Sequence, residues 1–223
     1  MSGRLTRWSS GLLVLAGLLT GLPVLFRPDM TQPGFALRAP WVPVNLLLGI
    51  GAVIGTAGLI VLYRAMSSRI SAFGHLAFVL TILGSILSAG MLLFVEAAIV
   101  PVLSSDPAYT SLLAMSGPLM AGSFGVLAML SMVILAVGFL LLGIYLISSS
   151  TVTFVNGLLF IIGAPLLAFA PPLPPVAGVV GGVILGIALA WIGISIRSGI
   201  AHESLAPGLR IEDECVVHAG GHA

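Results

Sequence analysis

The sequence predicts an all-α fold, a polytopic membrane helical bundle with six transmembrane helices. Hydrophobic residues make up 59% of the 223 residues and charged residues only 7%, a balance that a soluble domain of this size could not bury. The mean hydropathy is +1.22. At least six stretches approach the ~20 apolar residues that cross a bilayer core of ~30 Å. The lipid bilayer is therefore the first expected partner of the chain.

The positions of the six spans follow from these apolar stretches. The spans are expected at 9–26, 42–63, 72–101, 118–147, 152–170 and 176–196. The first resembles a signal peptide, but "LFRPDM" offers no small-x-small cleavage site, so we interpret it as a retained helix. The third and fourth exceed what a bilayer needs, so their outer ends should protrude. Between them, Asp106 as a cap and Pro107 at the first helical position predict a short helix.

The arginines predict the orientation, since the chain contains no lysine. Only Arg27 and Arg38 fall on one side of the predicted spans. On the other side lie Arg4, Arg7, Arg64, Arg69, Arg197 and Arg210. The side richer in arginine is expected to be cytoplasmic. This predicts a multi-pass protein of the cell inner membrane with both termini cytoplasmic, a transmembrane domain at 1–198 and a cytoplasmic tail at 199–223.

A weak internal repeat suggests how the helices are arranged. The even-numbered spans read "GTAGLIVLYRAMSSR", "AVGFLLLGIYLISSS" and "LGIALAWIGISIRSG". This favours three antiparallel hairpins around a pseudo-threefold axis, with coincidence among Gly/Leu-rich segments as the alternative. On "WVPVNLLLGIGAVIGTAGLIVLYR" and "GFLLLGIYLI", the chain resembles a broad group of uncharacterised prokaryotic six-helix membrane proteins built from such hairpins. The resemblance implies this fold and assigns no functional residue.

Small residues at four-residue spacing predict where helices touch. Two stripes are formed by Gly178, Gly182, Gly186 and Ala190 in the last span, and by Gly51 and Gly55 in the second. In lipid, small residues let helix backbones approach closely. The stripes are expected to pack within the monomer or against a membrane-protein partner or a second copy of the chain.

Glu96 stands alone in the apolar run "GMLLFVEAAIVP" (90–101). Its distance from Arg69 along a helix, ~40 Å, places it near the outer interface. There it is expected to pair with Arg27 or Arg38 of the first outer loop. The alternatives are a buried carboxylate that carries protons or a cation, and a contact with a partner.

Two features suggest metal or cofactor chemistry. Cys215, His218 and His222 have the spacing C-x2-H-x3-H in the tail, and a thiolate with two imidazoles suits zinc or copper; a merely solvated tail is the alternative. His75, the one histidine in a span, is a candidate single axial ligand of haem or chlorophyll, although an interfacial ring needs no ligand role. No other cofactor is expected.

The sequence contains no set of residues typical of an enzyme. "GIGAVIG" lies in a predicted membrane helix and follows no strand, and the serines have no nearby base. The scattered arginines form no nucleic-acid-binding patch. We therefore expect a non-catalytic protein, an accessory or scaffolding subunit of a membrane complex. The alternative functions are a small transporter or lipophilic-ligand carrier that uses Glu96, and metal binding by the tail. A polar cavity at mid-membrane would favour the carrier, and dry packing with an unmatched apolar outer surface would favour the subunit.

Overall fold

The structure is a computed structural model that describes residues 3–29, 34–66, 70–110, 112, 117–149, 152–169 and 173–205. The described residues form helices and no strand. Six principal helices are α1 (Gly3–Gly21), α2 (Trp41–Met66), α3 (Ala72–Gly90), α7 (Ser123–Ser148), α8 (Phe154–Ala168) and α9 (Pro175–Leu205). The shorter elements are η1 (Pro23–Phe26), η2 (Phe35–Leu37), the π-helical segment η4 (Met91–Ile99), α4 (Val100–Ser104), α5 (Pro107–Thr110) and α6 (Pro118–Ala121).

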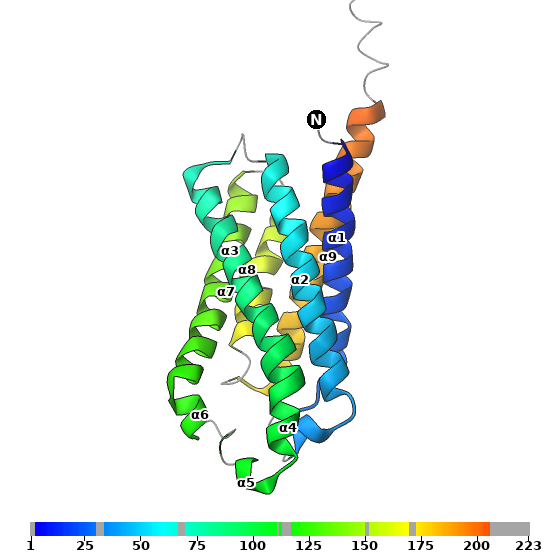
Figure 1. Cartoon of the computed structure of the whole chain (residues 1–223). Coiled ribbons are helices and arrows are strands. Elements are labelled where there is room, and N and C mark those ends of the chain that lie inside the picture. Colours follow the sequence, from blue (N-terminus) through cyan, green and yellow to red (C-terminus); the bar gives the residue numbers. More distant parts are fainter. Residues whose placement is uncertain are drawn as a thin grey trace, which may run out of the picture.

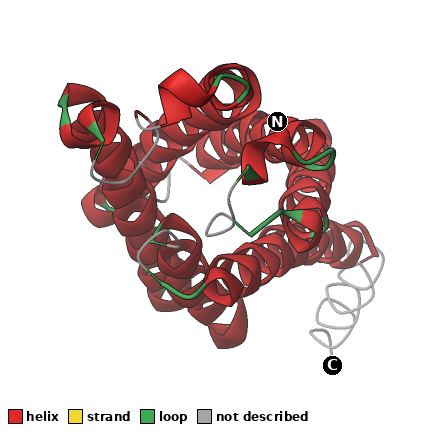
Figure 2. Cartoon of the chain, turned by 90° about the horizontal axis from the view of Figure 1, so that it is seen from below, coloured by secondary structure: helices red, strands yellow, loops and turns green. Residues whose placement is uncertain are grey.

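The six principal helices form a closed ring. Neighbours pack in the order α1, α2, α3, α7, α8, α9 and back to α1, and the view along the helix axes shows this ring (Figure 2). The described start of α1 and the end of α9 lie at one end of the ring, which we call the terminal end (Figure 1). The elements α4, α5 and α6 lie at the opposite end, which we call the loop end.

Five of the principal helices are long and apolar enough to cross a membrane, including the continuous helical stretch Ala72–Ser104. The sixth, α8, has only 15 residues. The prediction of a span at 152–170 is therefore too long. Two further predictions are corrected. The span at 118–147 is interrupted at Gly122, whose extended backbone separates α6 from α7, and the span at 72–101 contains a π-helical segment before α4.

Small residues close the seams on both sides of α1. A Cβ atom at Gly186 of α9 would lie 2.7 Å from the Gly17 carbonyl oxygen, and one at Gly51 of α2 would lie 2.9 Å from the Leu19 side chain. Serines reinforce both seams, since Ser9 donates to the Gly58 carbonyl of α2 (3.1 Å) and Ser10 to the Gly193 carbonyl of α9 (2.7 Å). Backbone contact of this kind leaves no room for a larger side chain.

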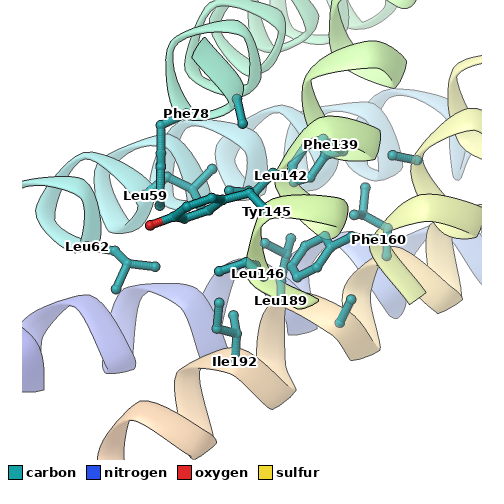
Figure 3. Packing of buried hydrophobic residues seen from close by; sticks show 14 of the residues in the cluster. Leu59, Leu62, Phe78, Phe139, Leu142, Tyr145, Leu146, Phe160, Leu189 and Ile192 are labelled. Carbon is teal, nitrogen blue, oxygen red and sulfur yellow. The ribbon is translucent and has the colours of Figure 1, made fainter. Parts of the chain in front are cut away.

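The terminal half of the ring is filled by side chains. Phe78, Leu142, Tyr145, Leu146 and Phe160 are buried together there (Figure 3). The rings of Phe139 and Phe160 are stacked with centroids 5.6 Å apart. This core joins α3, α7, α8 and α9 and forms the floor of the cavity described next.

Candidate functional site

A cavity of about 150 Å³ lies inside the ring, on the loop-end side of the apolar core. All six principal helices and η4 contribute to its wall. Its floor includes Leu59, Phe139 and Leu189, which also belong to the core. Its polar lining residues are Thr20, Arg27, Ser85, Ser88, Glu96 and Ser131. A cavity of this size can hold a group about as large as a benzene ring.

The cavity wall contains one acidic and one basic side chain. Arg27 follows η1 at the end of the first span, and Glu96 lies in η4. Their opposite charges attract each other, and both side chains are partly exposed. Among the described residues, however, no hydrogen bond joins them, and Nε of Arg27 is buried without an acceptor. Because a buried donor without an acceptor is costly, such a donor beside a void is unusual in a purely structural role.

Pro101 accounts for the local helix geometry at Glu96. A proline inside an α-helix clashes with the carbonyl four residues before it and lacks the N–H that would bond to it. The chain relaxes into the π register, in which the Val100 N–H bonds to the Val95 carbonyl, five residues back. In that register the donor for the Glu96 carbonyl would come from Pro101, which has none. The Glu96 carbonyl is thereby left open to a partner outside its own helix.

Trp41 supplies that partner from the start of α2. Its indole Nε1 donates to the Glu96 carbonyl at 2.8 Å, and its side chain is 0% exposed. The Arg27 guanidinium lies over the same indole, 5.3 Å from the ring centroid, a cation–π arrangement. One buried tryptophan thus positions both charged residues of the cavity. π-helical segments are frequent at functional sites.

In the loop half of the ring, η4 and α7 pack against different helices. There η4 packs against α2, whereas α7 packs against α3 nearer the terminal end. Among the described elements, the two paths diverge toward the loop end, where α6 and the start of α7 stand apart from α4 (Figure 1). Apolar side chains on both sides of this divergence are exposed, among them Phe94 on η4 and Val126 and Met129 on α7. The stretch Ala72–Ser104 is also less buried than the other four long apolar helices. In its most apolar window 28% is buried, against 44% in the corresponding window of each of the other four.

The site residues that were predicted from the sequence lie in different parts of the structure. Arg27 and Glu96 share the cavity, whereas Arg38 is exposed. The ring nitrogen Nδ1 of His75 lies 2.9 Å from the Ser71 carbonyl, and the ring packs edge-on against Tyr63. The tail residues Cys215, His218 and His222 lie outside the described residues.

The glycine stripes lie within the ring. Gly182 packs against Val24, Gly186 against Gly17 and Gly21, and Gly55 against Ala16. Gly178 is buried in α9, and Ala190 contacts Gly17. The two stripes therefore face α1 and the segment that follows it.

Sequence reasoning missed the role of Trp41. Pro101 was the available signal, because a proline near the end of a long apolar helix indicates an open carbonyl within the preceding turn or so. Of the hydroxyls, Ser131 donates to the Ala128 carbonyl of its own helix (2.7 Å), as Thr81 does to Ala77 (2.7 Å). These bonds explain why such hydroxyls are tolerated in apolar helices.

Comparisons of the chain with protein-family models, with curated proteins and with solved structures gave no match. The site must therefore be interpreted from its own geometry.

Proposed function

We propose that the protein is a membrane carrier that binds a small amphipathic ligand inside the helical ring. The observation that carries this proposal is the cavity wall, which combines apolar side chains with a charged pair that has no direct hydrogen bond. A ligand headgroup at Arg27 and Glu96 would receive the hydrogen bonds that the two side chains do not make to each other. An apolar part would contact the remaining wall, as in most ligand pockets.

The divergence of η4 and α7 suggests how the ligand enters. In this proposal the six helices span the inner membrane as three antiparallel hairpins, α1–α2, α3–α7 and α8–α9, with both termini cytoplasmic. The exposed apolar residues at the divergence then face lipid. An amphipathic ligand could pass between η4 and α7 from the outer leaflet without crossing water.

The arginine distribution supports this orientation. It can be tested with cysteine probes at Ser198 and Ser105, which are exposed at opposite ends of the ring, in a Cys215→Ser background. An impermeant thiol reagent applied to intact cells should label the probe at Ser105 and spare the probe at Ser198. The reverse pattern would overturn the orientation and move the entry to the inner leaflet.

The accessory-subunit hypothesis has less support. One of its two supports was a glycine face available to a partner, and Gly51, Gly55, Gly182 and Gly186 lie against other parts of the same chain. It keeps the exposed apolar flank of α7 as a possible contact, but lipid covers such a flank equally well.

The carrier proposal can be tested by blocking the cavity. Ser88 lines it from α3, whereas Leu83 is 43% exposed on the same helix. Native mass spectrometry of the gently extracted protein should show bound small molecules in the wild type and in Leu83→Phe. The same adducts should be lost in Ser88→Phe. Equal adducts in Ser88→Phe and Leu83→Phe would contradict the proposal.

A further inference from the structure

We propose that the headgroup bound at Arg27 and Glu96 is a zwitterion with a phosphate and a primary ammonium, as in an amine-bearing phospholipid. This inference rests on the carrier function proposed above. It assigns the phosphate to Arg27 and the ammonium to Glu96. The argument uses charge balance, donors and acceptors, and the space available.

Charge balance favours a ligand without net charge. The cavity wall contains one guanidinium and one carboxylate, so its formal charges cancel. An anionic headgroup would leave an excess negative charge in a mostly apolar site inside the ring, and such a charge is expensive to bury. A zwitterion keeps the sum at zero and places each of its charges beside an opposite one.

The hydrogen-bonding groups favour a ligand with an acceptor and a donor. Nε of Arg27 is buried without an acceptor, and a guanidinium offers only donors. The ionised carboxylate of Glu96 offers only acceptors. A phosphate beside Arg27 and an N–H group beside Glu96 would both form charge-assisted hydrogen bonds, the stronger kind. A choline headgroup has the same charges but no N–H to donate.

The space and the entry route favour a lipid. The cavity of about 150 Å³ is large enough for a headgroup but not for acyl chains. Met91, Leu92 and Met132 line it, and the diverging η4 and α7 leave a route by which acyl chains could remain in the bilayer. A hydrophilic zwitterion such as a free amino acid has no apolar chain that would use this route.

A headgroup methylation series tests this inference on the unaltered full-length protein. The purified, delipidated protein is titrated by calorimetry with short-chain phosphatidylethanolamine, its N-methyl and N,N-dimethyl forms, and phosphatidylcholine. All four carry the same charges, and only the last lacks an N–H. We expect a loss of affinity of about tenfold at the final methylation. The phosphatidylglycerol of equal chain length should also bind about tenfold more weakly than phosphatidylethanolamine.

Three variants connect the preference to the two residues. Glu96→Leu, which removes both the charge and the acceptor, should bind phosphatidylethanolamine and phosphatidylcholine equally, Arg27→Gln should weaken both, and Arg38→Gln, at an exposed site, should change neither. Equal affinities across the methylation series, still abolished by Ser88→Phe, would overturn the zwitterion inference and leave the carrier function standing. Lipid binding that Ser88→Phe does not reduce would overturn both.

Discussion

The two halves of the helical ring differ in what fills them. In the terminal half, large side chains such as Phe78, Leu146 and Phe160 are buried to within a few per cent and fill the interior. In the loop half, the same helices surround a cavity with Arg27 and Glu96 in its wall. Well-packed interiors contain few voids larger than water. The difference indicates that the terminal half provides stability, and the cavity in the loop half is where we propose that a ligand binds.

The largest expected difference between the halves is the cost of truncation. Phe160→Ala removes a side chain that is 0% exposed and leaves a cavity behind, so it should cost about 3–5 kcal/mol. Met91→Ala removes atoms that already face a void, and it should cost less than about 2 kcal/mol because fewer contacts are lost. Chemical unfolding in detergent measures both. Equal costs would mean that the loop half is packed as tightly as the terminal half.

A second prediction concerns the seams that hold both halves together. Gly186→Leu places a side chain where the backbone of α1 already lies, with Gly21 N only 2.7 Å from the new Cβ. Because the two helix backbones cannot move apart without losing their contact, the free energy of unfolding should fall by about 3 kcal/mol, the upper end for overpacking. Gly11→Leu is the matched control, because no atom lies within 4 Å of its Cβ. A similar melting temperature for the two variants would remove the close α1–α9 contact.

The seams also show what the sequence could predict. The glycine spacing indicated packing faces in α2 and α9, because in lipid a small residue has few other uses at that spacing. It could not indicate that both faces meet the same helix, since closure of the ring depends on all six helices together. The short helix after Asp106 was confirmed, with the Ala108 N–H bonded to the Asp106 carboxylate at 2.9 Å. That signal is local and independent of tertiary contacts.

The limits of prediction are clearest at the candidate site. Arg27 and Glu96 were identified because charges are rare in this chain, but sequence spacing could not separate Arg27 from Arg38 in the same loop. The cavity itself has no sequence signal, because a void is the absence of side chains between helices whose positions are set elsewhere.

A third prediction compares the same enlargement in the two halves. Ala164 is 0% exposed in the core, whereas Ala52 lines the cavity. Ala164→Leu should cost about 1–3 kcal/mol because the added atoms have no space. Ala52→Leu should change stability by less than about 0.5 kcal/mol, since its atoms enter the void, while it reduces ligand binding. A large loss of stability in Ala52→Leu would indicate that the cavity closes in the unliganded protein.

A fourth prediction measures the interaction across the cavity. Glu96→Gln and Arg27→Gln, made singly and together, should show a coupling of about 1–2 kcal/mol, because removing one charge leaves the other buried alone. Glu96→Leu should be more destabilising than Glu96→Gln, which keeps the shape and some hydrogen bonding. The pair Glu96→Gln with Arg38→Gln is the control and should be additive. Additive losses of stability in both double variants would mean that Glu96 and Arg27 do not interact electrostatically.

The smallest expected effect isolates the single hydrogen bond that holds the π-helical segment. Trp41→Phe keeps an aromatic ring beneath Arg27 and against Phe35, whose ring centroid lies 4.8 Å from that of Trp41. It removes the indole N–H and strands the Glu96 carbonyl, for which Pro101 offers no donor. The free energy of unfolding should therefore fall by about 1 kcal/mol.

Trp8→Phe, at a site that is 69% exposed, provides the control and should leave stability within about 0.5 kcal/mol of the wild type. Ligand affinity separates positioning from stability. If Trp41 orients Glu96, Trp41→Phe should weaken binding more than Trp8→Phe does, even at temperatures where both variants are fully folded. Unchanged affinity in Trp41→Phe would mean that the π-helical segment holds Glu96 in place without the indole.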